Sequence, residues 1–413
     1  MRILFLTNFY PPASRGGFER WCQEVADGLV TRGHELAVLT SKHNREAIDQ
    51  IEHGWIHRDL NLEMEFASFR NSIQFFTKRK SREAENQYRI RQLIADFEPE
   101  VALIWGMWNL SDHIPALIEN LMPGRVAYYM GDYWPTLPSQ IEVYWQVPPR
   151  SWATSIPKYL LKDAALRSLA KEEKPNIRFK HVIFPTTFMR DDLTKKGFSP
   201  ARSSIVYGAI DTRPYLNING STADHLNGAL NLLFVGRLDH EKGPHLAIDA
   251  LGHLVKRFGF NNLKLIIVGE GEPEYEQKLR QLAKEKNVDS AVIFRGALPG
   301  DKLPELYHEA DIFLFTSIWP EPFGRVIIEA MAAKVAVVGS ATGGAAEIMV
   351  DKVNALLFIP GDAADLATKT AQLIVDPGLR KQLAEQGRVT AMEKFDVDRM
   401  VVEIEAYLAE LVK

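Results

Sequence analysis

The sequence alternates short apolar runs rich in β-branched residues with longer amphipathic segments. This alternation is typical of βαβ units, in which helices connect parallel strands and cover both faces of a sheet. Five such runs occupy residues 3–7, 36–40, 101–105, 126–130 and 181–185 of the first half. Five more follow in the second half, at residues 230–235, 263–268, 292–295, 312–316 and 335–339. The pattern therefore predicts an α/β protein with two Rossmann-like, doubly wound domains.

The length supports two domains, because 413 residues exceed the roughly 100–200 residues of an ordinary domain. Residues 211–227 are rich in Asn, Ser, Thr and Gly without periodicity, so we expect the linker near them. We predict an N-terminal domain over residues 1–205, a second domain over 206–395 and a terminal helix over 396–413. That helix has one apolar stripe, so it must pack on one of the two domains, and the N-terminal domain is one candidate. Two such domains facing a central cleft would bind ligands at the carboxyl ends of their strands.

The composition excludes several classes of protein. The net charge of −4 is too small to recruit nucleic acid, and 46% hydrophobic with 25% charged residues is typical of a soluble globular protein. The single cysteine, Cys22, cannot form an internal disulfide and lies on the apolar side of a predicted helix. The first apolar run is too short for a signal peptide, and no run could cross a bilayer. We therefore expect a cytoplasmic protein, with attachment to the inner face of the cell membrane left open.

A loop with two cations follows the apolar run at 230–235. It extends from Gly236 to Gly243 and delivers Arg237 and Lys242 next to a helix that begins near Pro244. Arginine offers a planar fork for two oxygens, lysine offers a mobile charge, and the helix N-terminus adds about half a positive charge. The loop is thus predicted to bind a pyrophosphate, although a surface loop with ordinary salt bridges could have the same residues.

A second loop, after the run at 312–316, carries two carboxylates. Two prolines hold Glu321 in an extended entry to a helix, and Gly324 leaves the first-turn amides accessible to an anion without a metal. Glu329 follows about two turns along this apolar helix, where a charged side chain needs a partner. Carboxylates accept hydrogen bonds from paired hydroxyls, as in a ribose or a sugar. The alternative is that Glu321 is a helix-entry charge and Glu329 a solvated helical residue.

The Glu-x7-Glu spacing of Glu321 and Glu329 resembles the signature of retaining family-4 glycosyltransferases of the GT-B fold. The apolar run at 335–339 and the sequence Gly-Gly-Ala-Ala-Glu at 343–347 also match that signature. Further similar segments are the phosphate loop at 236–243, the domain junction at 207–211 and Arg15-Gly16-Gly17. The resemblance spans nearly the whole chain and is strongest from Val206 onward.

This resemblance implies transfer of a hexose from a UDP-sugar, such as UDP-glucose, to a glycan or lipid-linked sugar acceptor in polysaccharide biosynthesis. It implies retention of configuration and neither a metal nor another cofactor. Arg237 and Lys242 would bind the donor diphosphate, and Glu321 the hydroxyls of the transferred sugar. Glu329 would bind the ribose. Gly16 and Gly17 would close over the phosphates, with free amides facing the anion. The remaining implied donor contacts are Arg295, Gly296, Pro322, Phe323, Gly324, Arg325 and Val326. Gly269-Glu270-Gly271 follows the run at 263–268 without the third glycine of a dinucleotide fingerprint, and we interpret it as a turn that lines the donor site, with Glu270 as a donor contact.

The chain departs from the family at two positions. Many relatives have a His-Asp pair after the strand that corresponds to residues 126–130, where this chain has Gly131-Asp132. Either Asp132 takes over a catalytic role, or the strand simply ends in a turn at Gly131. Lys334 replaces a glycine that commonly ends the helix of Glu329, so we expect a different turn there.

Other interpretations concern the reaction and the acceptor. A sugar-nucleotide epimerase, a phosphorylase or a non-catalytic sugar-nucleotide binding protein would use the same scaffold, whereas the long loop after residue 7 disfavours a nicotinamide dehydrogenase. The basic stretch 69–91 contains Ile73, Phe75 and Phe76 and could dock on anionic lipid. Aromatic and apolar side chains that could stack on an acceptor sugar, although half of them could be ordinary core or interface residues, are Trp105, Met107, Trp108, Tyr133, Trp134, Tyr144, Trp145 and Trp152.

Overall fold

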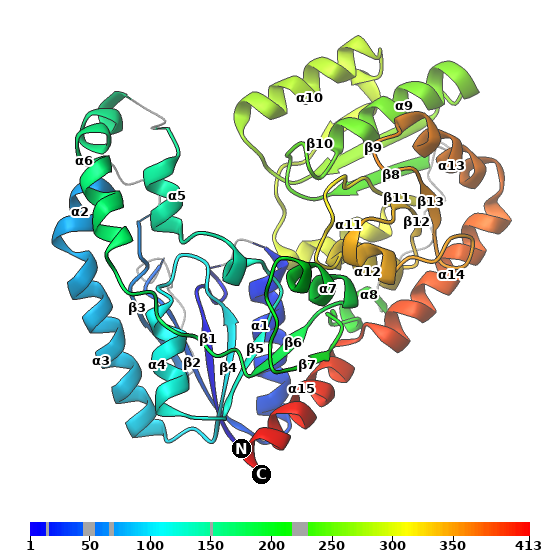
Figure 1. Cartoon of the computed structure of the whole chain (residues 1–413). Helices are drawn as coiled ribbons and strands as arrows, with labels where there is room; N and C mark the ends of the chain where they lie inside the picture. Colours follow the sequence, from blue (N-terminus) through cyan, green and yellow to red (C-terminus); the bar gives the residue numbers. More distant parts are fainter. Residues whose placement is uncertain (14–15, 44–53, 66–69, 149–151, 217–229) are drawn as a thin grey trace. The chain divides into compact units, whose positions relative to one another are not determined.

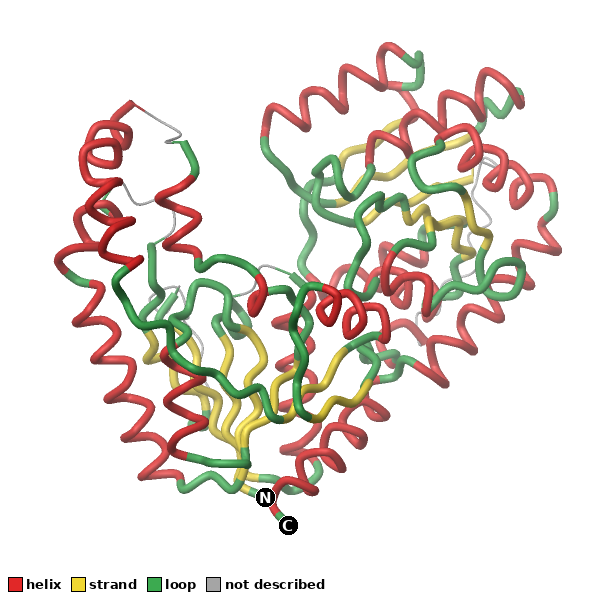
Figure 2. The backbone as a smooth tube through the Cα atoms, in the orientation of Figure 1, coloured by secondary structure: helices red, strands yellow, loops and turns green. Residues whose placement is uncertain are grey.

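The computed structural model describes residues 1–13, 16–43, 54–65, 70–148, 152–216 and 230–413, with the side chains of 152–155 and 157 outside the description. Arg15, Phe69 and most of the predicted linker therefore lie outside the described residues. The chain forms two compact units. The first comprises Met1–Pro185, Arg190–Val206 and Val401–Lys413, and the second Thr186–Met189 and Tyr207–Met400. Each unit is built around its own parallel sheet (Figure 1 and Figure 2).

The first unit contains a seven-stranded sheet in the order β3-β2-β1-β4-β5-β6-β7, with every strand pair parallel. The strands are β1 (Arg2–Thr7), β2 (Glu35–Ser41), β3 (Ile56–Leu60), β4 (Val101–Gly106), β5 (Val126–Tyr129), β6 (His181–Phe184) and β7 (Arg202–Ile205). All six residues of β4 are buried, as expected for a strand in a sheet covered on both faces. The strand order reverses between β1 and β4, which is where doubly wound sheets bind ligands.

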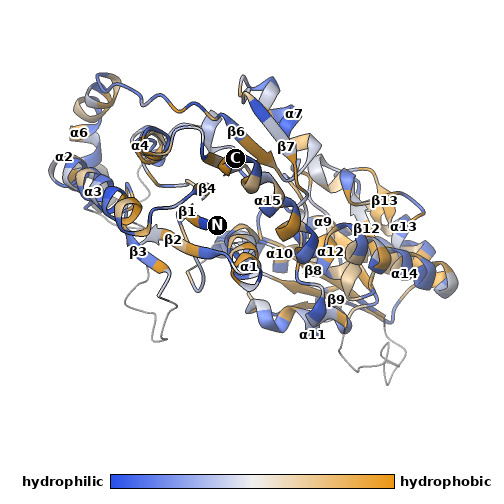
Figure 3. Cartoon of the chain, turned by 90° about the horizontal axis from the view of Figure 1, so that it is seen from below, coloured by the Kyte–Doolittle hydropathy of each residue, from blue (hydrophilic) through white to orange (hydrophobic). Residues whose placement is uncertain are grey.

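Helices cover both faces of this sheet. The helices of this unit are α1 (Gly17–Thr31), α2 (Asn71–Thr77), α3 (Arg79–Phe97), α4 (His113–Leu121), α5 (Gln140–Gln146), α6 (Trp152–Ala170) and α7 (Thr187–Lys195). Of these, α6 packs on α2 and α5 at one end of the unit, beyond the sheet (Figure 1). Figure 1 and Figure 3 show α3 and α4 on one face, while α1 lies on the other. The apolar runs of the sequence are thus strands, and amphipathic segments between them are helices that cover the sheet.

The last helix, α15 (Val397–Val412), lies beside α1 (Figure 3). A Cβ atom on Gly28 of α1 would come within 2.5 Å of Val401 Cγ2, so the glycine allows the close approach of the two helices. Glu405 accepts a hydrogen bond from Arg32 Nε at 2.6 Å and contacts His34 Nε2 at 2.7 Å. Residues 401–413 therefore form part of the first unit, next to the N-terminal strand and helix.

The second unit contains a six-stranded parallel sheet in the order β10-β9-β8-β11-β12-β13. Its strands are β8 (Leu230–Val235), β9 (Leu263–Val268), β10 (Val292–Phe294), β11 (Ile312–Phe315), β12 (Ala336–Ser340) and β13 (Leu356–Phe358). Its helices are α8 (Arg213–Leu216), α9 (Pro244–Phe258), α10 (Pro273–Glu285), α11 (Leu303–His308), α12 (Arg325–Ala332), α13 (Ala363–Val375) and α14 (Pro377–Lys394). The predicted α/β class with two parallel sheets is confirmed.

Candidate functional site

The loop after β8 is held against the turn after β9 by close backbone contacts. A Cβ atom on Gly269 would lie 1.8 Å from the Gly236 carbonyl oxygen, and one on Gly271 would lie 2.0 Å from that of Leu238. The Leu238 amide also donates to the Glu270 carbonyl at 2.8 Å. The structure therefore places the backbone of Glu270 next to the Arg237 loop, as the sequence interpretation of a lining turn requires. The Glu270 side chain is exposed.

The same loop is also fastened to the segment after β11. Gly243, the residue before α9, has φ 71°, and a Cβ there would lie 2.2 Å from the Thr316 carbonyl oxygen. Thr316 Oγ1 donates to the Lys242 carbonyl at 2.9 Å, and Ser317 Oγ donates to that of Glu241 at 3.2 Å. These contacts bring together the two loops that the sequence singled out.

Lys242 and Glu321 meet at the junction of these loops. Lys242 Nζ lies 2.5 Å from Glu321 Oε1, and the two side chains are only 19% and 12% exposed. The ammonium group also lies 5.5 Å from the centre of the Trp319 ring. A phosphate that binds Lys242 and a sugar hydroxyl that binds Glu321 would therefore be adjacent. Arg237 differs, because its side chain is 66% exposed and lies 3.3 Å from Asp239.

The N-terminus of α12 has no capping side chain among the described residues. Gly324 precedes the helix with φ 153°. By contrast, α13 and α14 begin with the capping carboxylates of Asp362 and Asp376. Helix N-termini favour anions because their first amides and the helix dipole are positive. A carboxylate cap would compete with a phosphate, and the helix after Glu321 has none.

Two glycines after β12 hold the entry to α12 in place. A Cβ on Gly343 would lie 2.5 Å from the Glu321 carbonyl oxygen, and one on Gly344 would lie 2.3 Å from that of Pro322. The Gly344 amide donates to the Glu321 carbonyl at 2.7 Å, and Thr186 Oγ1 donates to that of Pro322 at 2.8 Å. The glycines of the family signature thus position the backbone of Glu321 and Pro322. Phe323 and Gly324, which follow, are buried.

Glu329 is 2% exposed and is held from two sides. Tyr307 in α11 donates its hydroxyl to Glu329 Oε2 at 3.0 Å, and Arg325 Nε donates to Oε1 at 3.1 Å. Burial and the adjacent carboxylate raise the pKa of Tyr307 well above its ordinary value. The expectation that Glu329 has a partner is confirmed, whereas its contact with a ribose remains a prediction. Tyr307 was not singled out from the sequence, since nothing local links it to Glu329. Val326, whose carbonyl also accepts from Tyr307 at 3.3 Å, lies in the same turn of α12.

Lys334, which replaces the family's glycine, adopts φ 61°. This is the left-handed conformation that favours glycine after a helix. The lysine itself therefore makes the kind of turn that a glycine would make, and the replacement does not require a different one. Its ammonium group forms an ion pair with Glu385.

The predicted base-binding turn lies at the end of β10. Gly296 has φ 69°, and a Cβ there would meet nothing within 4 Å, so the space beside it is open. Its carbonyl accepts from the Gly269 amide at 2.9 Å. The Arg295 side chain forms a 2.7 Å ion pair with Glu309. The backbone of this turn, rather than the arginine side chain, is thus the part that could lie against a base.

In the first unit, the N-terminus of α1 differs from the sequence expectation. The Gly16 amide was expected to be free for a phosphate, but it donates to Glu19 Oε2 at 3.1 Å. Glutamate at the third helical position commonly reaches back in this way, as in a capping box. The expectation of a free Gly16 amide is therefore wrong, because a carboxylate already occupies it. Gly17 is the first residue of α1.

The Gly131-Asp132 pair after β5 has a packing explanation. A Cβ on Gly131 would lie 2.1 Å from an atom of the Phe18 ring, so a larger residue cannot be accommodated without displacing the ring. Burial raises the pKa of Asp132 to about 7, assisted by the negative charge of Glu19. The Trp134 amide donates weakly to Asp132 Oδ1 at 3.4 Å and opposes this shift.

Several aromatic candidates for acceptor binding are core residues. Trp105, Met107 and Trp145 are at most 2% exposed, so for these three the alternative of a core residue holds and they do not face an acceptor sugar. Trp105 and Met107 are buried at the end of β4, and Trp145 belongs to the small core between α2, α5 and α6, where large side chains bury most surface. The partly exposed members are Trp108, Tyr133, Trp134 and Tyr144. The Trp152 side chain lies outside the described residues.

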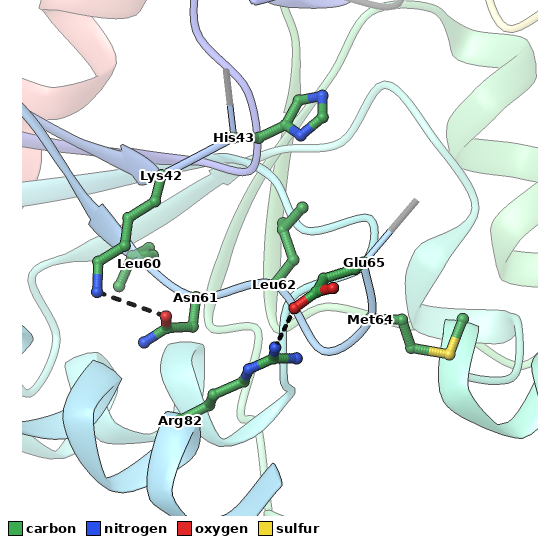
Figure 4. A pocket seen from close by; sticks show the side chains of 8 residues that line it. All are labelled: Lys42, His43, Leu60, Asn61, Leu62, Met64, Glu65 and Arg82. Atoms are coloured by element: carbon green, nitrogen blue, oxygen red, sulfur yellow. Dashed lines mark hydrogen bonds and ion pairs between the residues drawn. The ribbon is translucent and has the colours of Figure 1, made fainter. Parts of the chain in front are cut away.

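A polar pocket of about 350 Å³ lies at the carboxyl ends of β2 and β3 (Figure 4). Lys42 Nζ contacts Asn61 Oδ1 at 3.4 Å and Glu85 Oε1 at 2.7 Å, and the hydrogen bond to Lys42 contributes most to lowering the pKa of Glu85. Across the pocket, Arg82 is paired with Glu65. Because β3 was not predicted, these residues were not expected to lie together.

The part of the chain that the structure describes contains no group of three or more His, Cys, Asp or Glu side chains that could hold a metal ion. None of the described helices combines the length and apolarity needed to span a bilayer.

The comparisons with known proteins identify the class. The chain resembles the solved sucrose-phosphate synthase from Thermosynechococcus elongatus with a TM-score of 0.73, at 19% identity, covering 99% of this chain and 98% of that chain. HepE of Anabaena, solved in complex with UDP and glucose, gives a TM-score of 0.69 at 20% identity, covering 99% of each chain. Glycogen synthase of Mycobacterium tuberculosis is 36% identical over 96% of this chain and 91% of its own length. The fold is therefore the GT-B fold of glycosyltransferases.

Family models place the chain more closely. The model of glycosyltransferase family 4 matches residues 15–213, and the model of glycosyl transferases group 1 matches residues 225–390. Together with the full-length relative, these matches show that the chain belongs to the family-4, group 1 glycosyltransferases.

Proposed function

We propose that this glycosyltransferase is a cytoplasmic enzyme that transfers a hexose from a UDP-sugar, with UDP-glucose as the first choice, to a glycan or lipid-linked sugar acceptor in polysaccharide biosynthesis. The observation that carries the proposal is the Lys242–Glu321 pair, which lies between the glycine-started helices α9 and α12. The choice of donor is supported by the UDP and UDP-glucose complexes of HepE, a protein with the same fold.

The proposed reaction breaks the bond between the anomeric carbon and the donor phosphate. Negative charge develops on the departing diphosphate, and groups that bind it more strongly in the transition state accelerate the reaction. Arg237, Lys242 and the first amides of α12 would supply this stabilisation without a metal ion. The acceptor hydroxyl would attack from the face that the diphosphate leaves, so configuration is retained. Its proton would pass to the departing phosphate.

Glu321 would orient the transferred sugar. Its carboxylate lies beside the Lys242 ammonium, so a hydroxyl bound to one oxygen would hold the sugar next to the phosphate-binding cation. Glu329 is almost fully buried, and each of its oxygens already accepts one bond. A ribose hydroxyl would add a further bond to this carboxylate, since each oxygen has two acceptor sites.

The acceptor would bind to the first unit. The pocket of Figure 4 offers the side chains that hydroxyl-rich ligands use, namely ammonium, guanidinium, amide and carboxylate groups. Lys42 and Arg82 are both held by carboxylates, which fixes their positions before a ligand arrives. Asp132, with its pKa near neutrality, is the candidate acid or base of this unit.

Donor affinity in Lys242→Ala tests the proposal. A hydrogen bond to a charged group contributes about 1.5–3 kcal/mol, so the dissociation constant for UDP-glucose should rise about 10- to 100-fold in calorimetry. Lys286→Ala is the matched control, since Lys286 forms an equally short ion pair with Asp249 elsewhere in the second unit. Equal donor affinity in Lys242→Ala and the parent would refute the site.

Product analysis separates the remaining functions. Incubation of the parent enzyme with UDP-glucose and a set of glycan acceptors should release UDP and form an α-linked product, with a chelator present or absent. An epimerase would instead convert the donor without an acceptor, a phosphorylase would need phosphate, and a binding protein would release no UDP.

A further inference from the structure

An exposed apolar surface lies at the end of the first unit formed by α2, α5 and α6, where α6 packs against both other helices (Figure 1). Tyr159 is 83% exposed, Leu160 71% and Ile156 60%. Large apolar side chains this exposed are common singly, but contiguous groups mark contact sites. We call this group, with Val147 and Phe76, the apolar end.

The apolar end surrounds a pocket of about 490 Å³ between α5 and α6. Trp145 lines the pocket, and its ring centre lies 5.4 Å from that of Phe75 and 6.3 Å from that of Phe76. Val147, Ile156 and Leu160 line it as well. The pocket is thus an opening into the small hydrophobic core beneath these helices. A hydrocarbon chain would find apolar contacts there, whereas water would find few polar partners.

Lysines border the apolar end. Lys162 is partly exposed and lines the pocket. Lys158 lines it as well but is only 5% exposed, because its Nζ donates to the Val147 carbonyl at 2.6 Å and lies 4.3 Å from the centre of the Tyr144 ring, so it does not contribute to the charged border. Lys78 and Lys80, at the junction of α2 and α3, are exposed. Their long stems can lie on apolar surface while the ammonium groups reach a polar layer.

We propose that the apolar end docks on an anionic phospholipid bilayer, with hydrocarbon in the pocket and the ammonium groups of Lys78, Lys80 and Lys162 at the level of the headgroups. The combination of exposed aromatic and aliphatic side chains with a border of lysines fits the interface of an anionic membrane. This rests on the proposed function in one respect, because a lipid-linked acceptor would be presented at such a surface.

The structure also revises the sequence-based lipid hypothesis, which centred on residues 69–91. Phe75 is buried, and Arg79 is paired with Glu172, so neither is available to a membrane. Ile73 and Phe76 are exposed and belong to the helix that packs on α6. The apolar end is therefore centred on α5 and α6, and only part of the basic stretch contributes to it.

Vesicle sedimentation of the full-length protein tests the docking. We expect binding to vesicles of phosphatidylcholine mixed with phosphatidylglycerol, weaker binding to phosphatidylcholine alone, and loss of binding as salt is added. In the double variant Tyr159→Asp, Leu160→Asp the partition coefficient should fall at least about tenfold, because two charges replace the most exposed apolar side chains. Val375→Asp is the matched control, since Val375 is 68% exposed on α13 of the second unit.

Three results would overturn the docking proposal. The first two are unchanged partitioning of the double variant and equal binding of the parent to both kinds of vesicle. The third is a dimer of the parent in sedimentation velocity that the double variant abolishes, because a second copy would then cover the surface. UDP-glucose binding serves as the separate readout. The double variant should retain it, and its absence from the parent would refute the proposed function while vesicle binding still stood.

Discussion

Replacing Gly131 with alanine should destabilise the first unit, because the added methyl group has no room. Its Cβ would lie 2.1, 2.8 and 2.9 Å from three atoms of the Phe18 ring, whereas carbon atoms in contact are about 3.5–4.0 Å apart. The ring is partly exposed, but two aromatic neighbours limit its retreat. Its centre lies 5.6 Å from that of Trp105 and 6.3 Å from that of Tyr129, and those two rings are stacked at 4.2 Å.

The size of the effect follows from two opposing contributions. Overpacking a filled site costs about 1–3 kcal/mol, while replacing glycine by alanine gains about 0.4–1 kcal/mol by restricting the unfolded chain. The net free energy of unfolding should fall by about 1–2 kcal/mol. For a unit of this size, the melting temperature changes by roughly 2–4 °C per kcal/mol, so the first unit should melt about 2–8 °C lower.

Thermal unfolding followed by tryptophan fluorescence is a suitable assay, because Trp105 belongs to the affected cluster. Gly54→Ala is the control, since a Cβ on Gly54 would meet nothing within 4 Å. Phe18→Ala should remove most of the penalty of Gly131→Ala, with a coupling of about 0.5–3 kcal/mol in a double-mutant cycle. A melting temperature unchanged in Gly131→Ala, or additive effects in the cycle, would refute the packing argument.

Two further substitutions test buried groups. The folded-state pKa of Asp132 is about 7, far above its ordinary value, so its contribution to stability falls as the pH rises from about 4 to 7. Melting temperatures measured between about pH 5 and pH 8 should therefore rise in Asp132→Asn relative to the parent as the pH increases. Both proteins retain Glu63, whose pKa of about 8 leaves each of them with some loss of stability at high pH; parallel pH profiles would contradict the role of Asp132. Tyr307→Phe removes one of the two hydrogen-bond donors of buried Glu329 and should lower the free energy of unfolding in urea by about 1–3 kcal/mol. Tyr275→Phe, at a partly exposed tyrosine, is the near-neutral control, and equal losses of stability in the two variants would count against the role of Tyr307.

The sequence predicted the interior of both sheets better than their edges. Every predicted strand is present, but β3, β7 and β13 were missed, and all three lie at sheet edges. An edge strand pairs on one side only, so it can be short and polar, as Ile-His-Arg-Asp-Leu in β3 shows. Burial on both faces produces continuous apolar runs, and such runs become short or interrupted where that burial ends.

The sequence pointed to the loops of the candidate site where each follows a strand, but it did not indicate contacts between distant segments. The loops of Lys242 and Glu321 were identified locally, and the structure joins them. Tyr307 lies 22 residues before Glu329 on another helix, and no spacing rule connects the two. The occupied Gly16 amide could have been foreseen, because a glutamate three residues into a helix often bonds back to its start.

The replacement of the family's histidine can be understood from the same packing that makes Gly131 necessary. The Phe18 ring occupies the space that any side chain at position 131 would need, so a histidine there would have to displace the ring. Burial at the next position raises the pKa of Asp132 to about 7, close to the value of about 6.5 for an unperturbed histidine. A carboxylic acid that titrates near neutrality can donate or accept a proton under the conditions in which imidazole does. Aromatic packing thus accounts for the glycine at position 131, and desolvation of Asp132 provides a different side chain that titrates near neutral pH.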